Sequence, residues 1–419
     1  MKFVDVASVV SQAAAQVLGA DYMSEAGDIA EYDAGQLADL GTKIIGTSSG
    51  SNATLGVDVA LKTILDECGK IVFESRSYTG ELDEMFIDSR EWGGYMVRYY
   101  FGLASVMTDE MWNPDGFVDY FAASSAGVNE ALRIAAIEHG FYKPAVTAKI
   151  YQKAMSHMTP ITTMREQFTV AWTSWDKINE FISSILTQVE NTIKALSQAK
   201  AHALLCCAVY LAASAGNIRF LLDEYNGESG TLTSAEALQD KDFLAYALEE
   251  ISTTRDNMRL MSAAYNDPDN ISFSQGDDNK LVVLNKFSKA AKFRVRANTY
   301  NEELLGIGDY MGVTAWQAFL DSDGNNFGLD TISTVSINTY NGGIEPVSNV
   351  DPVVYTQAGV IALAFDRRAL GICLKKDKVT TAYTASRDTW NSFYHTLFQQ
   401  IIDPNFKMVV FALHDASQD

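Results

Sequence analysis

The chain has few cysteine and histidine residues. Its 419 residues include only four cysteines and five histidines. No two cysteines have CxxC spacing, and the histidines are too scattered to form a metal-binding pair. No Walker or HExxH motif is present. We therefore expect no catalytic residue, cofactor or metal site, and we interpret the cysteines as buried thiols of a reducing compartment.

Positive charge is also scarce. The chain has 32 Lys and Arg residues against 53 Asp and Glu residues, which gives a net charge of −21. Broad electrostatic binding to nucleic acid needs a basic surface, so this balance argues against that function. The segment 3–42 has seven acidic residues and no Lys or Arg. It is either a solvated acidic arm or an arm that docks on a basic surface of a neighbouring subunit.

Signals for export or membrane insertion are weak. The first ten residues lack the long apolar region of a signal peptide. The most apolar stretch, 201–215, is shorter than the ~20 residues that a membrane-spanning helix needs. We therefore expect a soluble cytosolic product.

Proline and glycine are absent between Pro160 and Gly216. Within this interval the pattern predicts one helix from Thr173 to about Ser214, because apolar residues recur at the spacing of a single helix face. Such a helix would be ~60 Å long. Two consecutive helices with a kink near Ser197 are the alternative. The apolar face includes Ile178, Phe181, Ile185, Val189 and Ile193.

The helix follows an excursion that could not bury its own surface. An aromatic, β-rich run covers 90–101, and 145–152 and 166–172 read as returning strands around an inserted segment, 108–142. A lone hairpin is marginal in water, so the excursion needs a partner chain. The expected subunit-interface residues are Trp92, Tyr95, Tyr99, Tyr100, Lys149 and Lys153.

Downstream of the helix, the strongest charge feature is basic. Residues 280–300 read as a strand, and 280–296 contain no acid. This basic strand face is solvated, complements the acidic arm of a neighbour, or faces DNA. Its central members are Lys286, Lys289, Lys292, Arg294 and Arg296.

The remaining elements alternate between helices and strands. We expect a helix from Ser234 to about Tyr265 and another over 302–320, followed by an Asp/Asn/Gly turn at 321–328. That turn resembles the start of a calcium loop, but Ile332 stands where a bidentate Glu is required. An apolar strand pair is expected at 359–374, flanking Asp366–Arg368, followed by a strand at 379–383, an aromatic stretch at 390–398 and a buried strand at 408–413.

Several of these stretches, in this order, resemble the major capsid proteins of tailed phages with the Hong Kong 97 fold, most closely those of short-tailed, podovirus-like phages. The likeness covers residues 57–413 and is weak across 103–142 and 321–350. Each motif alone is unspecific, and the order and spacing carry the match. The stretches that carry it are Val57–Tyr78, Gly93–Phe101, Ala145–Trp172, Phe168–Asp176, Phe181–Ile185, Gly359–Asp366, Trp390–His395 and Met408–Phe411.

This resemblance implies an α+β fold with a long spine helix, an antiparallel peripheral sheet, an axial domain, an extended β-loop and an N-terminal arm. The implied parts are an N-terminal arm at 1–56, the first peripheral part at 57–74, the extended loop at 75–168 with its tip at about 103–142, the spine-helix part of the peripheral domain at 169–226, the axial domain at 227–374 and the closing peripheral strands at 375–419.

It also implies a function: self-assembly, as hexamers and pentamers, into an icosahedral shell around phage double-stranded DNA. The shell would be a virion capsid assembled in the host cytoplasm. The implied partners are further copies of the chain, a separate scaffolding protein, a portal protein, minor or head-fibre proteins, and DNA bound without sequence specificity. Some members of this family cross-link a loop Lys to an Asn, but no such pair can be assigned here. The alternatives are an encapsulin-type nanocompartment shell and a cytosolic enzyme or binding protein with an unrecognised site.

Overall fold

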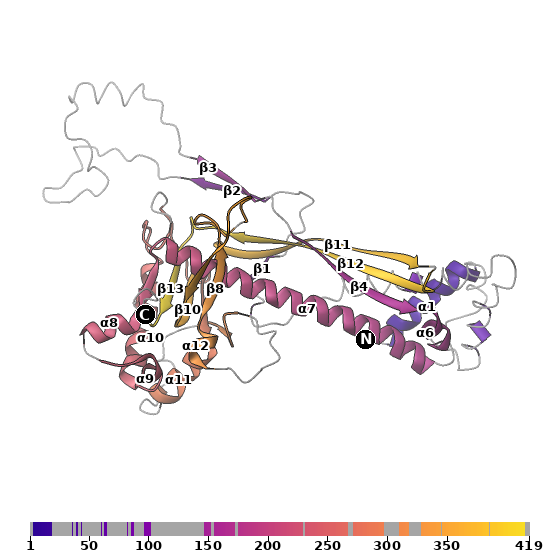
Figure 1. Ribbon diagram of the computed structural model, residues 1–419, viewed down its shortest axis with the longest axis horizontal. Coiled ribbons are helices and arrows are strands. Elements are labelled where there is room, and N and C mark those ends of the chain that lie inside the picture. Colours follow the sequence, from indigo (N-terminus) through magenta and orange to yellow (C-terminus); the bar gives the residue numbers. More distant parts are fainter. Residues whose placement is uncertain are drawn as a thin grey trace, which may run out of the picture.

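One long helix joins two sheet-containing parts of an elongated molecule (Figure 1). The computed structural model describes residues 3–18, 36, 39–40, 43, 60, 63–64, 82, 85–87, 96–101, 146–151, 155–171, 175–228, 231–266, 271–296, 310–317, 328–344, 346–384 and 386–414. The expectations for Trp92, Tyr95, Lys153, the inserted tip and residues 321–327 of the turn at 321–328 lie outside these residues.

The long helix, α7 (Trp175–Ser214), is continuous over 40 residues. The single-helix prediction is confirmed, and the kinked alternative near Ser197 is wrong. Asn217 N donates to Ala212 O at 2.8 Å, and Gly216, with φ +77°, occupies the left-handed position after the helix. This C-terminal motif closes α7 where the sequence predicts, because glycine adopts that conformation without a Cβ clash.

By length and hydropathy, α7 is one helix of the described chain that could cross a membrane, over Lys177–Ser214. Half of its most apolar window is buried inside the protein. The apolar residues of both halves belong to the buried interior, from Ile178 and Ile182 to Val209 and Ala212. The helix therefore serves as an internal spine.

The first half of α7 lies along a four-stranded sheet with long strands (Figure 1). The strand order is β1-β11-β12-β4, with β11, β12 and β4 antiparallel and β1 parallel to β11. Helix α1 (Phe3–Leu18) packs near this end of α7. The strands are β1 (Phe86–Ile87), β4 (Met155–Met164), β11 (Leu370–Thr384) and β12 (Thr389–Ile402).

The strand predicted at 166–172 is wrong. Strand β4 ends at Met164, where its partner β12 begins at Thr389, so no ladder is available beyond that residue. The chain continues as helix α6 (Arg165–Ala171) with Glu166 in its first turn, where a carboxylate favours the helix dipole. The β-branched and aromatic residues of this stretch misled the prediction.

The second half of α7 packs on a five-stranded sheet with order β5-β13-β10-β6-β7. Every residue of the two central strands β10 and β13 is buried, as expected for strands covered on both faces. The strands are β5 (Ile218–Phe220), β6 (Asn279–Leu284), β7 (Met311–Val313), β10 (Val360–Asp366) and β13 (Met408–Ala412).

The helices of this half cover the five-stranded sheet and correct three expectations. The predicted helix 234–265 is split by Asp240, whose carboxylate accepts from the backbone N–H groups of Asp242 and Phe243 and caps a second helix. Residues 311–313, predicted as helix, pair with β6 as a strand. The basic run after Leu284 is helical. The helices are α8 (Leu221–Glu228), α9 (Ser234–Ala237), α10 (Lys241–Asn257), α11 (Asn285–Arg296) and α12 (Leu329–Ile332).

The prediction of a basic strand face is therefore wrong. Phe287 and Ala291 are buried four residues apart, while Lys286, Lys289 and Lys292 are exposed at a spacing of three. That is helical rather than strand periodicity. Lys286, Lys289, Lys292 and Arg294 are exposed on α11, whose other side packs on the sheet; the side chain of Arg296 lies outside what the structure describes.

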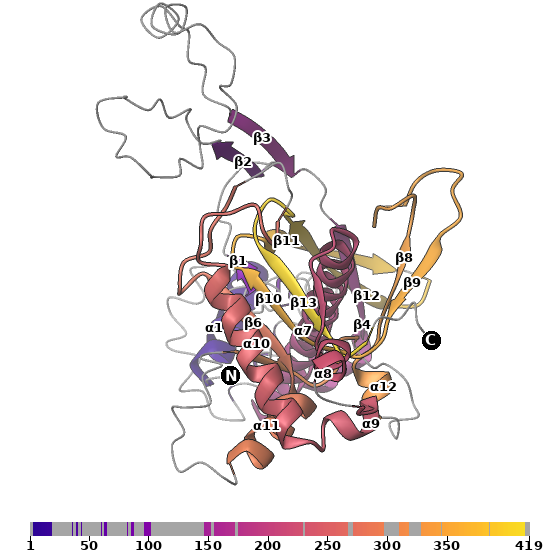
Figure 2. The ribbon, with the colours of Figure 1, turned by 90° about the vertical axis from the view of Figure 1, so that its left-hand side faces the viewer.

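Two hairpins stand away from this core. Strands β2 (Met96–Phe101) and β3 (Val146–Tyr151) pair antiparallel above the body in Figure 1, and the strand prediction for 145–152 is confirmed. Strands β8 (Val335–Thr339) and β9 (Val353–Gln357) form the other hairpin, which projects on the right in Figure 2.

Candidate assembly surfaces

A buried carboxylate anchors the root of the β2–β3 hairpin to the body. Asp403, in the turn after β12, is 0% exposed. Its carboxylate accepts a hydrogen bond from the Tyr100 hydroxyl and pairs with Arg98 Nη1 at 3.2 Å. Its other oxygen accepts from Asn405 N at 3.2 Å. Burial, followed by the bond to Asp403, raises the pKa of Tyr100, so this hydroxyl keeps its proton and remains a donor.

An aromatic ring beside the carboxylate completes this anchor. The Phe406 ring lies 6.0 Å from that of Tyr100, and the guanidinium groups of Arg98 and Arg368 lie 5.6 and 4.8 Å from its centroid. Arg98 Nη1 also donates to the carbonyl oxygen of Arg368. Cation–π contacts and a charge-assisted hydrogen bond together fix the direction in which the hairpin leaves the body.

The structure separates the candidate interface residues of this hairpin. Tyr99 is 63% exposed, whereas Tyr100, on the opposite side of the strand, belongs to the anchor. Lys149 Nζ lies 5.7 Å from the centroid of the Tyr151 ring. Of the expected loop residues whose side chains the structure describes, Tyr99 is the one that presents a large, exposed apolar surface.

The candidate residues of the spine helix lie in the interior. Ile178, Ile185, Val189 and Ile193 are buried, and Phe181 is partly exposed. Phe181 lines an open groove of about 780 Å³ between β4, α6 and α7, together with Val170 and Glu166. The buried residues of α7 thus support the four-stranded sheet. The groove is a surface at the end of that sheet where β4 is followed by α6.

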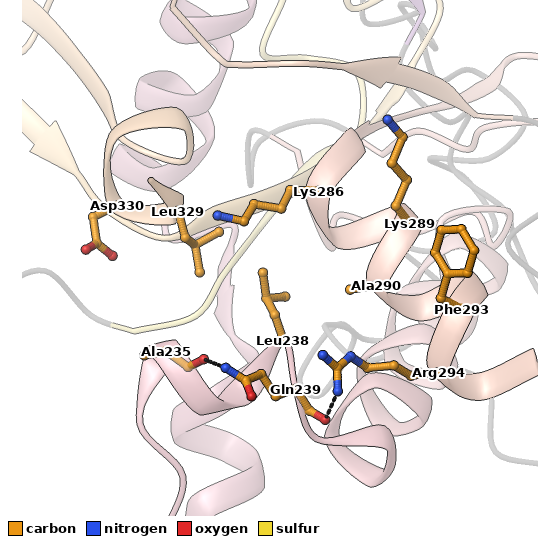
Figure 3. Close-up of a pocket in the computed structure, with 10 residues that line it drawn as sticks. All are labelled: Ala235, Leu238, Gln239, Lys286, Lys289, Ala290, Phe293, Arg294, Leu329 and Asp330. Carbon is orange, nitrogen blue, oxygen red and sulfur yellow. Dashed lines mark hydrogen bonds between the residues drawn. The ribbon is translucent and has the colours of Figure 1, made fainter. Parts of the chain in front are cut away.

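The basic helix α11 borders a cavity of about 550 Å³ beside α9 and α12 (Figure 3). Lys286 extends toward Leu329, and Arg294 Nη1 donates to Gln239 O at 2.8 Å. Phe293, in the same wall, is 78% exposed. Aromatic residues and Arg are enriched at protein interfaces, so the exposed ring of Phe293 beside Arg294 makes this wall a candidate interface.

A Ser–His–Asp chain of hydrogen bonds lies at the end of β13. The His414 ring bonds to the Ser234 hydroxyl through Nε2 and to Asp223 Oδ1 through Nδ1 at 3.1 Å. The order is that of a hydrolase triad. However, all three side chains are partly or largely exposed, and Gln357 Nε2 binds the His414 carbonyl oxygen at 3.0 Å. The network ties the end of β13 to α8, α9 and β9.

The anchoring residues Asp403, Phe406 and Arg368 were missed at the sequence level. Asp403 lies 305 residues from Arg98 and 303 from Tyr100, so no local pattern reports the pairing. The sequence contains only a weak signal for Asp403, which is that an acidic residue directly follows a strand with many buried residues.

Residues 41–412 match the family model described as Phi29-like phage major capsid protein. The chain belongs to this family. The capsid protein is thus a structural component of a phage virion and not an enzyme. No curated protein matches it in sequence.

Solved structures similar to the capsid protein come from phage particles. The capsid of Staphylococcus phage Andhra has 12% identity and a TM-score of 0.47, with 80% of this chain and 84% of that chain covered. A bacteriophage P68 structure of its head fibre and inner core protein has 12% identity and a TM-score of 0.45, covering 81% and 86%. The capsid of cyanophage P-SCSP1u has 12% identity and a TM-score of 0.39, covering 79% and 86%. The family match supports neither the nanocompartment shell nor the cytosolic enzyme or binding protein.

Proposed function

We propose that this capsid protein assembles as hexamers and pentamers into an icosahedral shell of the Hong Kong 97 type that encloses phage double-stranded DNA. The family match over residues 41–412 carries the proposal. The continuous spine helix, the long peripheral strands and the anchored β2–β3 hairpin support it, because each corresponds to a part that the shell architecture requires.

We assign the parts of the shell protein as follows. The four-stranded sheet with the first half of α7 is the peripheral domain, the five-stranded sheet with its helices is the axial domain, and the β2–β3 hairpin is the root of the extended loop. Strand β13, first expected in the peripheral domain as part of 375–419, pairs with β10 and β5. The axial domain in this assignment therefore includes Met408–Ala412.

The surface of the β2–β3 hairpin that carries Tyr99 is, in this proposal, covered by a neighbouring subunit. Replacing Tyr99 by alanine removes a mostly exposed aromatic ring, so particle yield should fall while the melting temperature of the protomer stays nearly unchanged. Normal particle yield from this variant would count against the assignment.

Electron microscopy of the protein expressed alone and together with its neighbouring reading frames tests the shell itself. We expect shells or capsomers with six- and five-fold order, and a requirement for a scaffolding protein to obtain closed particles of one size. A portal, head-fibre proteins and packaged DNA would be found in particles from infected cells. A monomer under every condition would refute the proposal.

A further inference from the structure

Two exposed apolar patches lie on the half of the molecule that contains the five-stranded sheet. The first, the turn patch, is formed by Leu260, Met261 and Ile271 in the connection between α10 and β6. The second, called the hairpin patch, is the end of the β8–β9 hairpin, where Val347, Val353 and Val354 are exposed and Val353 and Val354 lie on opposite faces. All six side chains are between 46% and 67% exposed. Apolar side chains gathered in this way mark interaction sites.

The turn patch is held rigidly from beneath. Ser262 and Ser272 exchange backbone hydrogen bonds of 3.1 and 3.2 Å, and Ser274 N donates to Met258 O at 2.9 Å. The buried Lys407 Nζ donates to Ser262 Oγ at 2.8 Å and to Ala264 O at 3.1 Å. A patch fixed in this way loses little conformational entropy when it binds, as a preformed docking surface should.

The β8–β9 hairpin packs against α7 at one point and is exposed at its patch. Tyr355 packs against Tyr210 of α7 with ring centroids 4.9 Å apart. Val353 and Val354 are successive residues of β9, so their side chains point to opposite faces of the hairpin. Because both are exposed, neither face of the hairpin is packed at this point, and a two-stranded hairpin is marginal without packing.

The two patches lie on elements at opposite sides of the five-stranded sheet. In Figure 2 the connection that follows α10 lies to the left of the five-stranded sheet, and β8–β9 projects to the right. The hairpin segment 335–357 contains Glu345 and Asp351 and no Lys or Arg. Beside the turn patch, Arg259 pairs with Asp256 and Arg368 pairs with Asp366, and both guanidinium groups stay partly exposed.

From these observations we propose that the β8–β9 hairpin of one subunit packs on the turn patch of the next copy of this chain. Different patches on opposite sides make a head-to-tail contact, which generates a ring when the rotation between copies closes, whereas a two-fold contact would pair a patch with itself. The inference rests on the proposed shell function and names the surfaces that would join neighbouring axial domains within a hexamer or pentamer.

Paired cysteines test the contact. Assembled Leu260→Cys/Val354→Cys protein, treated with a short bismaleimide, should give a ladder of covalent multimers ending at six on a denaturing gel. Each single variant should give only the background of the four native cysteines. Dimers from a single variant would show a patch meeting itself and would overturn the proposal. A double variant that assembles normally without a ladder would overturn it too, while leaving the shell function intact.

A second pair of variants does not depend on cross-linking. Val354→Asp places a charge in the hairpin patch, and Ser348→Asp adds the same charge at an exposed site of the same hairpin without removing apolar surface. We expect at least a tenfold loss of particles for the first variant, near-normal yield for the second and unchanged melting temperatures for both. Equal yields from the two variants would refute the contact. Absence of capsomers from the parental protein would refute the shell function, and this contact with it.

Discussion

Replacing Tyr100 by phenylalanine removes one hydroxyl from the hairpin anchor and leaves the ring in place. That hydroxyl donates to Asp403, which is fully buried and charged. A hydrogen bond to a charged group contributes about 1.5–3 kcal/mol. Asp403 keeps the contacts with Arg98 Nη1 and Asn405 N, so we expect a cost of about 2 kcal/mol.

The cost should appear as easier opening of the hairpin. A change of about 2 kcal/mol corresponds to a roughly 30-fold increase in the open population, since 1.4 kcal/mol is tenfold. Hydrogen exchange of the β2 and β3 amides should accelerate by that factor, while amides of β10 and β13 in the buried sheet should not change. The assay is mass-spectrometric hydrogen exchange on unassembled protein.

The neighbouring tyrosine provides the matched control. Tyr99 is 63% exposed, so Tyr99→Phe should change stability by less than about 0.5 kcal/mol. A double-mutant cycle of Tyr100→Phe with Arg98→Met should be non-additive, because both residues bind one carboxylate. Equal exchange rates for Tyr99→Phe and Tyr100→Phe, or additive effects in the cycle, would refute the anchor.

Two further predictions concern stability. Burial lowers the pKa of Lys407 to about 8 from 10.5, so above pH 8 the unfolded chain binds more protons and protomer stability should rise toward pH 10.5. Lys407→Met should abolish this rise in urea unfolding, and a rise that persists in the variant would exclude Lys407 as its source. At pH 7 the variant should be more stable than the parent, but by less than the ~3 kcal/mol to which the pKa difference corresponds, because the bonds to Ser262 and Ala264 are lost. Gly216→Ala should cost about 1 kcal/mol in the same assay, since φ is +77° and nothing lies within 4 Å of an added Cβ. Gly227→Ala, equally open but inside α8, should be neutral or stabilising, and equal effects of the two substitutions would contradict this account.

Local features of the sequence determined the elements that form through interactions between residues close in the chain. The absence of Pro and Gly and the spacing of Ile178, Ile185 and Val189 specify α7, and Gly216 specifies its end, because helix bonds and caps join residues three to five positions apart. The unbroken apolar runs of β10 and β13 predicted buried strands, because a strand covered on both faces is apolar along its whole length, although its pairing partners are distant in the chain. The order of these elements was sufficient to indicate the family.

Tertiary structure decided what depends on distant partners. Residues 165–171 and 311–313 took the opposite state to the predicted one, because β12 offers no further pairing to the first segment and β6 offers pairing to the second. The anchor formed by Arg98, Tyr100 and Asp403 joins residues some 300 positions apart. The places of the turn patch and the hairpin patch on opposite sides of the five-stranded sheet are seen only in the folded chain (Figure 2). A sequence pattern indicates which local conformation a residue favours among its neighbours in the chain. Only the folded chain shows which distant surface packs against that residue, or that the residue stays exposed.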